Sequence, residues 1–253
     1  MPDGLQLDSV YTDPATNPTR ASRLIVRFDE LYNVPVADRV ANLTARPWFA
    51  EMQAFFDIVS SKTGITYVYV SDDGAANGSP GLLGARGDVR IGGTVLDGPL
   101  AYNATPPDGG DMVINTDGTT FASTGNLRVV FGHEHAHGLG LGHVTVAGSQ
   151  SLSMVAGFGG NVNGPQTDDL QSLLRAYGDV REKSPGDGTA ANARPLGALP
   201  SSTLLTVGTL ATDLTVQAAE TDFPFSSNST DVDFFRFSVT SARRVAVKLS
   251  PQG

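Results

Sequence analysis

All four histidines of the 253-residue chain fall in one eleven-residue window, which reads HEHAHGLGLGH. The first and third of them, His133 and His137, are four positions apart. On a helix, two residues with this spacing lie one turn above each other on the same face. We therefore expect a helix through this window, with both imidazoles directed toward a single zinc ion.

Three glycines after the second predicted ligand set the path of the chain. Gly138, Gly140 and Gly142 allow the chain to leave the helix, turn sharply and bring His143 back as a third ligand. Zinc sites with three protein ligands keep a fourth position open and are catalytic rather than structural. The window thus predicts a catalytic site for one Zn²⁺ ion.

The two remaining polar residues of the window differ in their expected roles. Glu134 follows His133 at about 100° around a helix, too far to the side for a third ligand. It can instead take a proton from a metal-activated water, as the general base of a carbonyl hydrolysis. His135 points about 200° away from His133, so we expect that it is not a ligand.

Two alternatives compete with this prediction. A strand would place His133, His135 and His137 on one face, as in the metal sites of some β-barrels. A short HExxH match also arises by chance, in which case the cluster holds a metal only structurally or holds none. The third histidine, correctly spaced after Gly140, favours the catalytic helix.

Charge and cysteine content exclude several other classes of protein. The chain carries 17 Lys and Arg against 26 Asp and Glu, a net charge of −9, and has no basic cluster. We therefore expect no nucleic-acid partner. The absence of cysteine excludes disulfides, thiolate catalysis and cysteine-ligated zinc. No apolar run reaches the roughly 18 residues of a membrane span, so no transmembrane segment is expected.

Hydrophobic periodicity predicts a mixture of helices and short strands. Apolar residues at helical spacing predict a helix over 47–64. A second helix should begin near Asn126, and a third should cover 165–177 with Gly178 as its stop. Short apolar or β-branched runs predict strands at 24–28, 65–70, 88–91 and 111–114.

Changes in composition divide the chain into four predicted segments. Residues 1–22 are polar and turn-rich and form an N-terminal extension, and 23–182 form the catalytic domain. Residues 183–202, rich in Gly, Pro, Ala and Ser, have the composition of a linker. Alternating apolar and polar residues then predict a second, all-β domain over 203–253, which is short for a complete sandwich.

The stretch from His133 to His143 matches HExxHxxGxxH, and the chain therefore resembles the metzincin clan of zinc endopeptidases. Met154 resembles the methionine of their Met-turn, which lies beneath the zinc. The closer likeness is to matrixins, the family of the matrix metalloproteinases. It is carried by the end of the histidine window, LGLGH, by the segments GDVRIGG, LAYNATPP and GDMVINTD before it, and by QTDDLQSLLRAYG after it.

This resemblance implies an α+β fold, in which a long active-site helix lies behind a metzincin-like twisted mixed sheet. It implies that a peptide substrate adds a strand beside an antiparallel edge strand, which we expect at 111–114. Asp88 and Asp111 fall where matrixins have calcium-site residues, so Ca²⁺ is a second candidate ion, although ordinary turn and cap aspartates are an equal alternative. Tyr102 and Val113 stand at two places of the family's second zinc site, so a single zinc is expected.

Two further segments bear on specificity and location. Residues 155–164 correspond to the wall of the matrixin specificity pocket but depart from the family's pattern, so no cleavage preference follows. The tail, DVDFFRFSVTSARRVAVKLSPQG, resembles part of a bacterial pre-peptidase C-terminal domain, a small β-sandwich appended to secreted proteases. It implies a secreted or cell-surface bacterial protein. The start, MPDGLQLDSV, is no signal peptide, so we expect the export signal outside this chain; a cytoplasmic protein is the alternative.

These observations predict a monomeric zinc-dependent endopeptidase that hydrolyses protein or peptide substrates, with Glu134 as general base. A non-catalytic secreted or surface binding protein on the same scaffold is the alternative from another class, and the intact Glu134 speaks against it. A zinc hydrolase acting on a non-protein amide is a third hypothesis, because a zinc–glutamate pair does not identify the acyl group.

Overall fold

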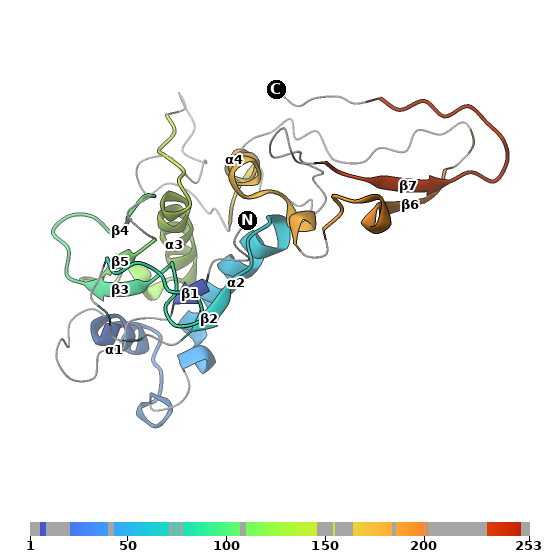
Figure 1. The fold of residues 1–253 in the computed structure, drawn as a ribbon. Coiled ribbons are helices and arrows are strands. Elements are labelled where there is room, and N and C mark those ends of the chain that lie inside the picture. The colour runs from blue at the N-terminus through green and yellow to red at the C-terminus, as the bar shows by residue number, and fades with distance from the viewer. Residues whose placement is uncertain are drawn as a thin grey trace.

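Helices and short strands follow one another along the chain (Figure 1). The computed structural model describes residues 6–8, 21–39, 43–70, 73, 75, 78–106, 110–145, 154, 164–183, 186–199, 201 and 232–248. These ranges contain four α-helices and seven strands, which confirms the expected α+β class. They also contain five 3₁₀ helices, Val36–Asp38, Leu43–Ala45, Thr120–Ala122, Val180–Glu182 and Ala190–Asn192. Among the described helices, none combines the length and the apolar character that crossing a bilayer requires.

The largest sheet has three short strands in the order β3–β5–β4. β3 (Ile91–Thr94) is parallel to β5 (Met112–Asn115), whereas β4 (Ala101–Asn103) is antiparallel to it. This three-stranded sheet is therefore mixed. Its order corrects one prediction: the segment 111–114 falls mainly on the central strand β5, and the antiparallel edge strand is β4, whose short run AYN gave no strand signal.

Two long helices form the core beside this sheet. α2 (Pro47–Lys62) and α3 (Thr124–Gly138) confirm the first two predicted helices. Pro47 occupies the first turn of α2, where its missing N–H costs nothing, and the Ser123 side chain caps α3. α3 lies next to β4, with α2 alongside it (Figure 1). The apolar side chains that α2 and α3 contribute to the buried core include Trp48, Met52, Phe55, Phe56, Val59, Leu127, Val130 and Phe131.

The segment predicted as a strand at 24–28 is a helix, α1 (Ala21–Leu31). A strand would have placed Leu24, Val26 and Phe28 on one face. Leu24 and Phe28 are instead fully buried while Val26 is 51% exposed, which is the pattern of a helix that buries one side. α1 packs on β3 at Gly93, where a Cβ would come within 3.0 Å of the Leu24 Cβ. Tertiary packing therefore overrides the β-branched character of the run.

The strand predicted at 65–70 is shorter than expected. β2 (Val68–Val70) pairs in parallel with β1 (Gln6–Asp8). The predicted N-terminal extension therefore contributes a strand next to residues of the predicted catalytic domain, which its polar composition did not indicate.

The third predicted helix, α4 (Thr167–Tyr177), is confirmed, and Gly178 ends it with a φ of 72°. Gln166 and Asp169 form a capping box at its start. At its end the Gly64 N–H donates to the Gly178 carbonyl, 2.9 Å away, which ties the last turn of α4 to the chain just after α2.

Two strands lie toward the C-terminus. β6 (Arg194–Ala198) and β7 (Phe235–Ser238) pair in parallel and lie apart from the four α-helices (Figure 1). β6 falls inside the segment predicted as a linker, so part of that segment is ordered and pairs with the predicted all-β domain. Residues 203–231, on which much of the rest of that domain was predicted, lie outside the described residues.

Candidate metal centre

The end of α3 brings the three predicted ligands together. His133 and His137 lie one turn apart on the helix, which ends at Gly138. The Leu141 N–H then donates to the Ala136 carbonyl and the Gly140 N–H to the His137 carbonyl, both at 2.9 Å, while Gly140 has a φ of 96°. This is a Schellman motif, which needs glycine at the left-handed position. It reverses the chain and returns His143 to the helix.

The three imidazoles converge on one point. The Nε2 atoms of His133, His137 and His143 form a triangle with all three sides at 3.1 Å. A tetrahedral ion bound at about 2.0–2.1 Å holds its ligand nitrogens about 3.3 Å apart, so the triangle fits zinc. His133 and His137 are half-buried and His143 is exposed, which leaves one side of the cluster open to solvent. The donor set, three neutral nitrogens, is the set that zinc accepts in catalytic sites.

A backbone contact fixes the orientation of the middle ligand. The His137 Nδ1 lies 2.8 Å from the Leu141 carbonyl oxygen. Because a carbonyl only accepts, Nδ1 carries the proton and Nε2 keeps its lone pair for a metal. Burial lowers the pKa of His137, which also favours the neutral ring that a metal requires. The turn that brings His143 back to the helix therefore also orients the His137 ring, with Nε2 available to bind a metal.

Glu134 lies on α3 next to the edge strand of the sheet. It is 8% exposed, and the backbone N–H of Asn103, the last residue of β4, lies close enough to its carboxylate to act on its pKa. Burial raises the pKa of Glu134 to about 7, and the Asn103 N–H opposes part of this rise. A carboxyl group with this pKa can both accept and release a proton near neutral pH.

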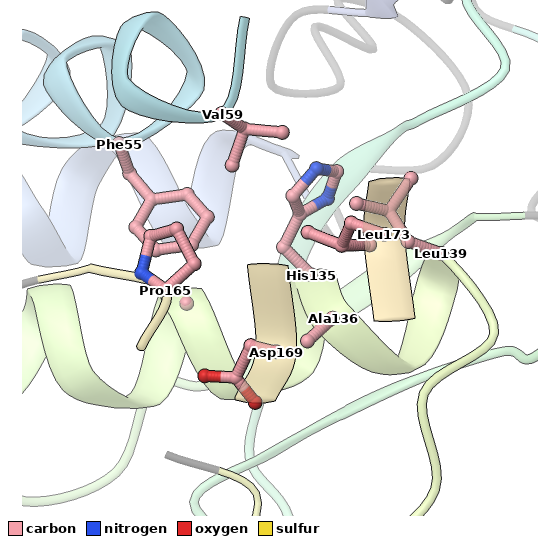
Figure 2. A pocket seen from close by; sticks show the side chains of 9 residues that line it. Phe55, Val59, His135, Ala136, Leu139, Pro165, Asp169 and Leu173 are labelled. Carbon is pink, nitrogen blue, oxygen red and sulfur yellow. The ribbon is translucent and has the colours of Figure 1, made fainter. Parts of the chain in front are cut away.

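His135 is on the opposite side of the helix, as its position 200° from His133 predicted. It is fully buried, and its Nε2 lies 2.6 Å from the Tyr67 hydroxyl oxygen. Figure 2 shows it at a small, mostly apolar cavity between α2, α3 and α4, with the Asp169 carboxylate directed away from it. This cavity is a gap in the packing behind α3 and not part of the three-histidine cluster.

Met154 is buried, 1% exposed, and its carbonyl accepts from the Val144 N–H at 2.9 Å. The predicted Met-turn residue is thus tied to the residue that follows the third histidine. The specificity-pocket wall predicted at 155–164 lies outside the described residues except for Gly164.

The two candidate calcium ligands lie on the segments that lead into β3 and β5. The Asp111 carboxylate accepts from the Gly78 N–H at 2.6 Å, whereas Asp88 is exposed. Within the described ranges, the only group of three metal-ligating side chains is the histidine triad. Calcium at Asp88 and Asp111 therefore stays a prediction, and among the described residues no third acidic side chain joins these two in a group that could hold a metal ion.

Two contacts of the site escaped sequence reasoning. The Leu141 carbonyl is a backbone group, so no residue type identifies it as the partner of His137. Asn103 is 31 positions before Glu134, and only the pairing of β4 with β5 places it there. In the sequence, the only indication that Asn103 belongs to the site was its place in the segment LAYNATPP, which precedes the strand segment GDMVINTD.

Comparison with models of known protein families gives no match for this chain, and no curated protein matches it.

Proposed function

We propose that this protein is a zinc-dependent endopeptidase with a metzincin-like, matrixin-related catalytic domain. The observation that carries the proposal is the triangle of His133, His137 and His143 nitrogens, 3.1 Å on each side, next to a buried glutamate. Three neutral ligands with one open side suit a catalytic rather than a structural ion. A binding module would have no use for Glu134.

The residues of the chain divide the work of hydrolysis. When bound by the three histidines, zinc supplies a Lewis acid that polarises the scissile carbonyl and acidifies a water molecule. Glu134 accepts the proton of the attacking water and passes it to the leaving amine. The Asn103 N–H holds the Glu134 carboxylate in place during both transfers. Under the proposal, Met154 supports the cluster from beneath.

The edge strand β4 supports a peptide as the substrate. The Asn115 N–H donates to the Leu100 carbonyl, and the Ala104 N–H donates to the Asp111 carbonyl. The backbone groups of Leu100 and Ala104 therefore face β5. Because direction alternates along an antiparallel strand, the backbone groups of Ala101 face the open edge. An extended peptide can pair there by strand addition, which brings its backbone next to Glu134. The tail resembles part of a domain that is appended to secreted bacterial proteases. Under the proposal, the enzyme therefore acts outside a bacterial cell.

Casein cleavage by the wild type and by Glu134→Gln tests the proposal, with zinc content measured for both. The substitution keeps the size of the side chain and an oxygen that can accept from Asn103, but removes the base. We expect about one zinc per chain in both proteins and a rate lowered by about 10²–10⁴-fold in the variant. Glu51→Gln, on α2 in an ion pair with Arg128, is the matched control and should cleave like the wild type.

Each other result points to a specific alternative. A wild type that binds zinc but cleaves no protein would favour the non-catalytic binding protein or a hydrolase of another amide. Folded protein that binds no zinc, measured against His143→Ala as a blank, would refute the metal centre itself.

A further inference from the structure

Asn103 lies where the edge strand β4 meets the helix that carries the proposed catalytic base. Leu100 and Ala104 direct their backbone bonds toward β5, so the alternation of the strand turns the N–H of Asn103 the other way. This N–H is directed toward α3 and lies close enough to the Glu134 carboxylate to stabilise its charged form. The backbone of Asn103 thus couples the edge strand directly to the base.

The side chain of Asn103 rests against a specific glycine of the same helix. Gly138 is four positions after Glu134, so both lie on one face of α3. A Cβ at Gly138 would lie 2.6 Å from the Asn103 Nδ2 and 3.1 Å from its Cγ. The carboxamide therefore occupies the space that any other residue at position 138 would fill.

Hydrogen bonding does not explain why an asparagine occupies this place. Both Nδ2 and Oδ1 are buried, and neither has a hydrogen-bond partner among the described groups. Leaving a buried amide unpaired costs stability, and such a loss is typical of functional sites rather than of ordinary packing. The contact that this side chain does make is its packing against Gly138, on the face of α3 that also carries Glu134.

We propose that Asn103 is a positioning residue for Glu134: its carboxamide, packed on Gly138, fixes the backbone N–H that orients the carboxylate. This inference rests on the proposed peptidase function. Misplacing a reacting group by about 1 Å costs on the order of a hundredfold in rate. The contact therefore acts on the chemical step rather than on substrate binding.

Gly138→Ala, Asn103→Ala and the double variant test this contact, assayed with a fluorogenic peptide taken from a site cut in casein. Gly138→Ala should lower kcat about tenfold or more, because the new methyl displaces the carboxamide, while KM and zinc content stay within about threefold of wild type. In the double variant the methyl has room, so kcat should return to at least that of Asn103→Ala. Gly125→Ala, at the other end of α3 with its nearest contact at 3.5 Å, is the matched control and should not change kcat.

A second measurement does not depend on cleavage. In ¹⁵N-labelled protein, the Asn103 amide proton should resonate downfield and exchange slowly, since it donates to a carboxylate. Both properties should be lost in Gly138→Ala and regained in the double variant. Wild-type kcat in Gly138→Ala, or losses that simply multiply in the double variant, would refute the contact alone. A wild type that cleaves no peptide would refute the peptidase, and with it the catalytic role of Asn103, whatever its amide proton does.

Discussion

At the residue scale, the buried ion pair between α1 and α2 shows how single side chains hold the body of the molecule together. Asp29 is 1% exposed, and its Oδ1 accepts from the Arg46 Nε at 2.8 Å and from the Trp48 Nε1 at 2.9 Å. Arg46 is itself 5% exposed. Removing the carboxylate would take away the negative charge that Asp29 places beside this buried guanidinium. Such a loss is far more costly than the loss of a surface pair.

We therefore expect Asp29→Ala to lower the free energy of unfolding by about 3 kcal/mol, measured by urea denaturation. Glu30→Ala, at the next position, removes an exposed carboxylate that pairs with Arg27 across one turn, and should cost less than about 1 kcal/mol. Equal losses in the two variants would contradict this assignment.

At the element scale, the crossing of α2 and α3 depends on one glycine. A Cβ at Gly132 would lie 2.5 Å from the Phe55 Cε2. The Phe55 ring packs edge-on against Phe56, Phe131 and His135, so a shift of the ring disturbs these three contacts. The two helices can therefore approach at this distance only because position 132 has no side chain.

Gly132→Ala should accordingly be less stable than Gly125→Ala by about 1–3 kcal/mol, the usual cost of overpacking a core. Both changes replace a glycine of α3 by alanine, and Gly125 has no contact closer than 3.5 Å, so the difference reports mainly the packing at the crossing. Urea denaturation in EDTA measures it without a contribution from zinc binding. Identical midpoints for the two variants would show that Phe55 can adapt.

The same scale explains which predictions succeeded. Helices α2, α3 and α4 and the turn that returns His143 follow from local rules, namely periodicity of 3.6, proline and glycine signals and the spacing of ligands. β4 is an edge strand because it pairs with β5, which itself pairs with β3 on its other side. The hydrophobic periodicity of a single segment carries no information about such pairing between segments. The run from Leu24 to Phe28 predicted a strand, and this was wrong because its packing on β3 at Gly93 favours a helix.

At the scale of the whole molecule, α4 links the packing behind α3 to the metal centre in front of it. The Tyr177 hydroxyl donates to the Leu139 carbonyl at 2.9 Å, at the turn that carries the chain toward His143. At the other end of α4, Asp169 is 3% exposed and accepts from the Gln166 N–H at 2.9 Å. Burial raises the pKa of Asp169 to about 7, with a smaller contribution from Asp168 and with the Gln166 N–H opposing the rise.

A raised pKa means that the folded protein holds this proton more tightly than the unfolded chain does. The contribution of Asp169 to the free energy of unfolding is therefore full below about pH 4 and falls, by up to about 1.4 kcal/mol per pH unit, as the pH rises toward 7. Asp169→Asn stays neutral and keeps an oxygen for the Gln166 N–H, so it should match the wild type near pH 4 and exceed it in stability at pH 8. Urea denaturation across this range measures the difference, with Asp57→Asn as an exposed control on α2 that should not alter the profile. A constant offset between Asp169→Asn and wild type at all pH values would mean that the carboxyl group is already charged in the folded protein, and that the start of α4 does not couple protonation to the stability of the whole.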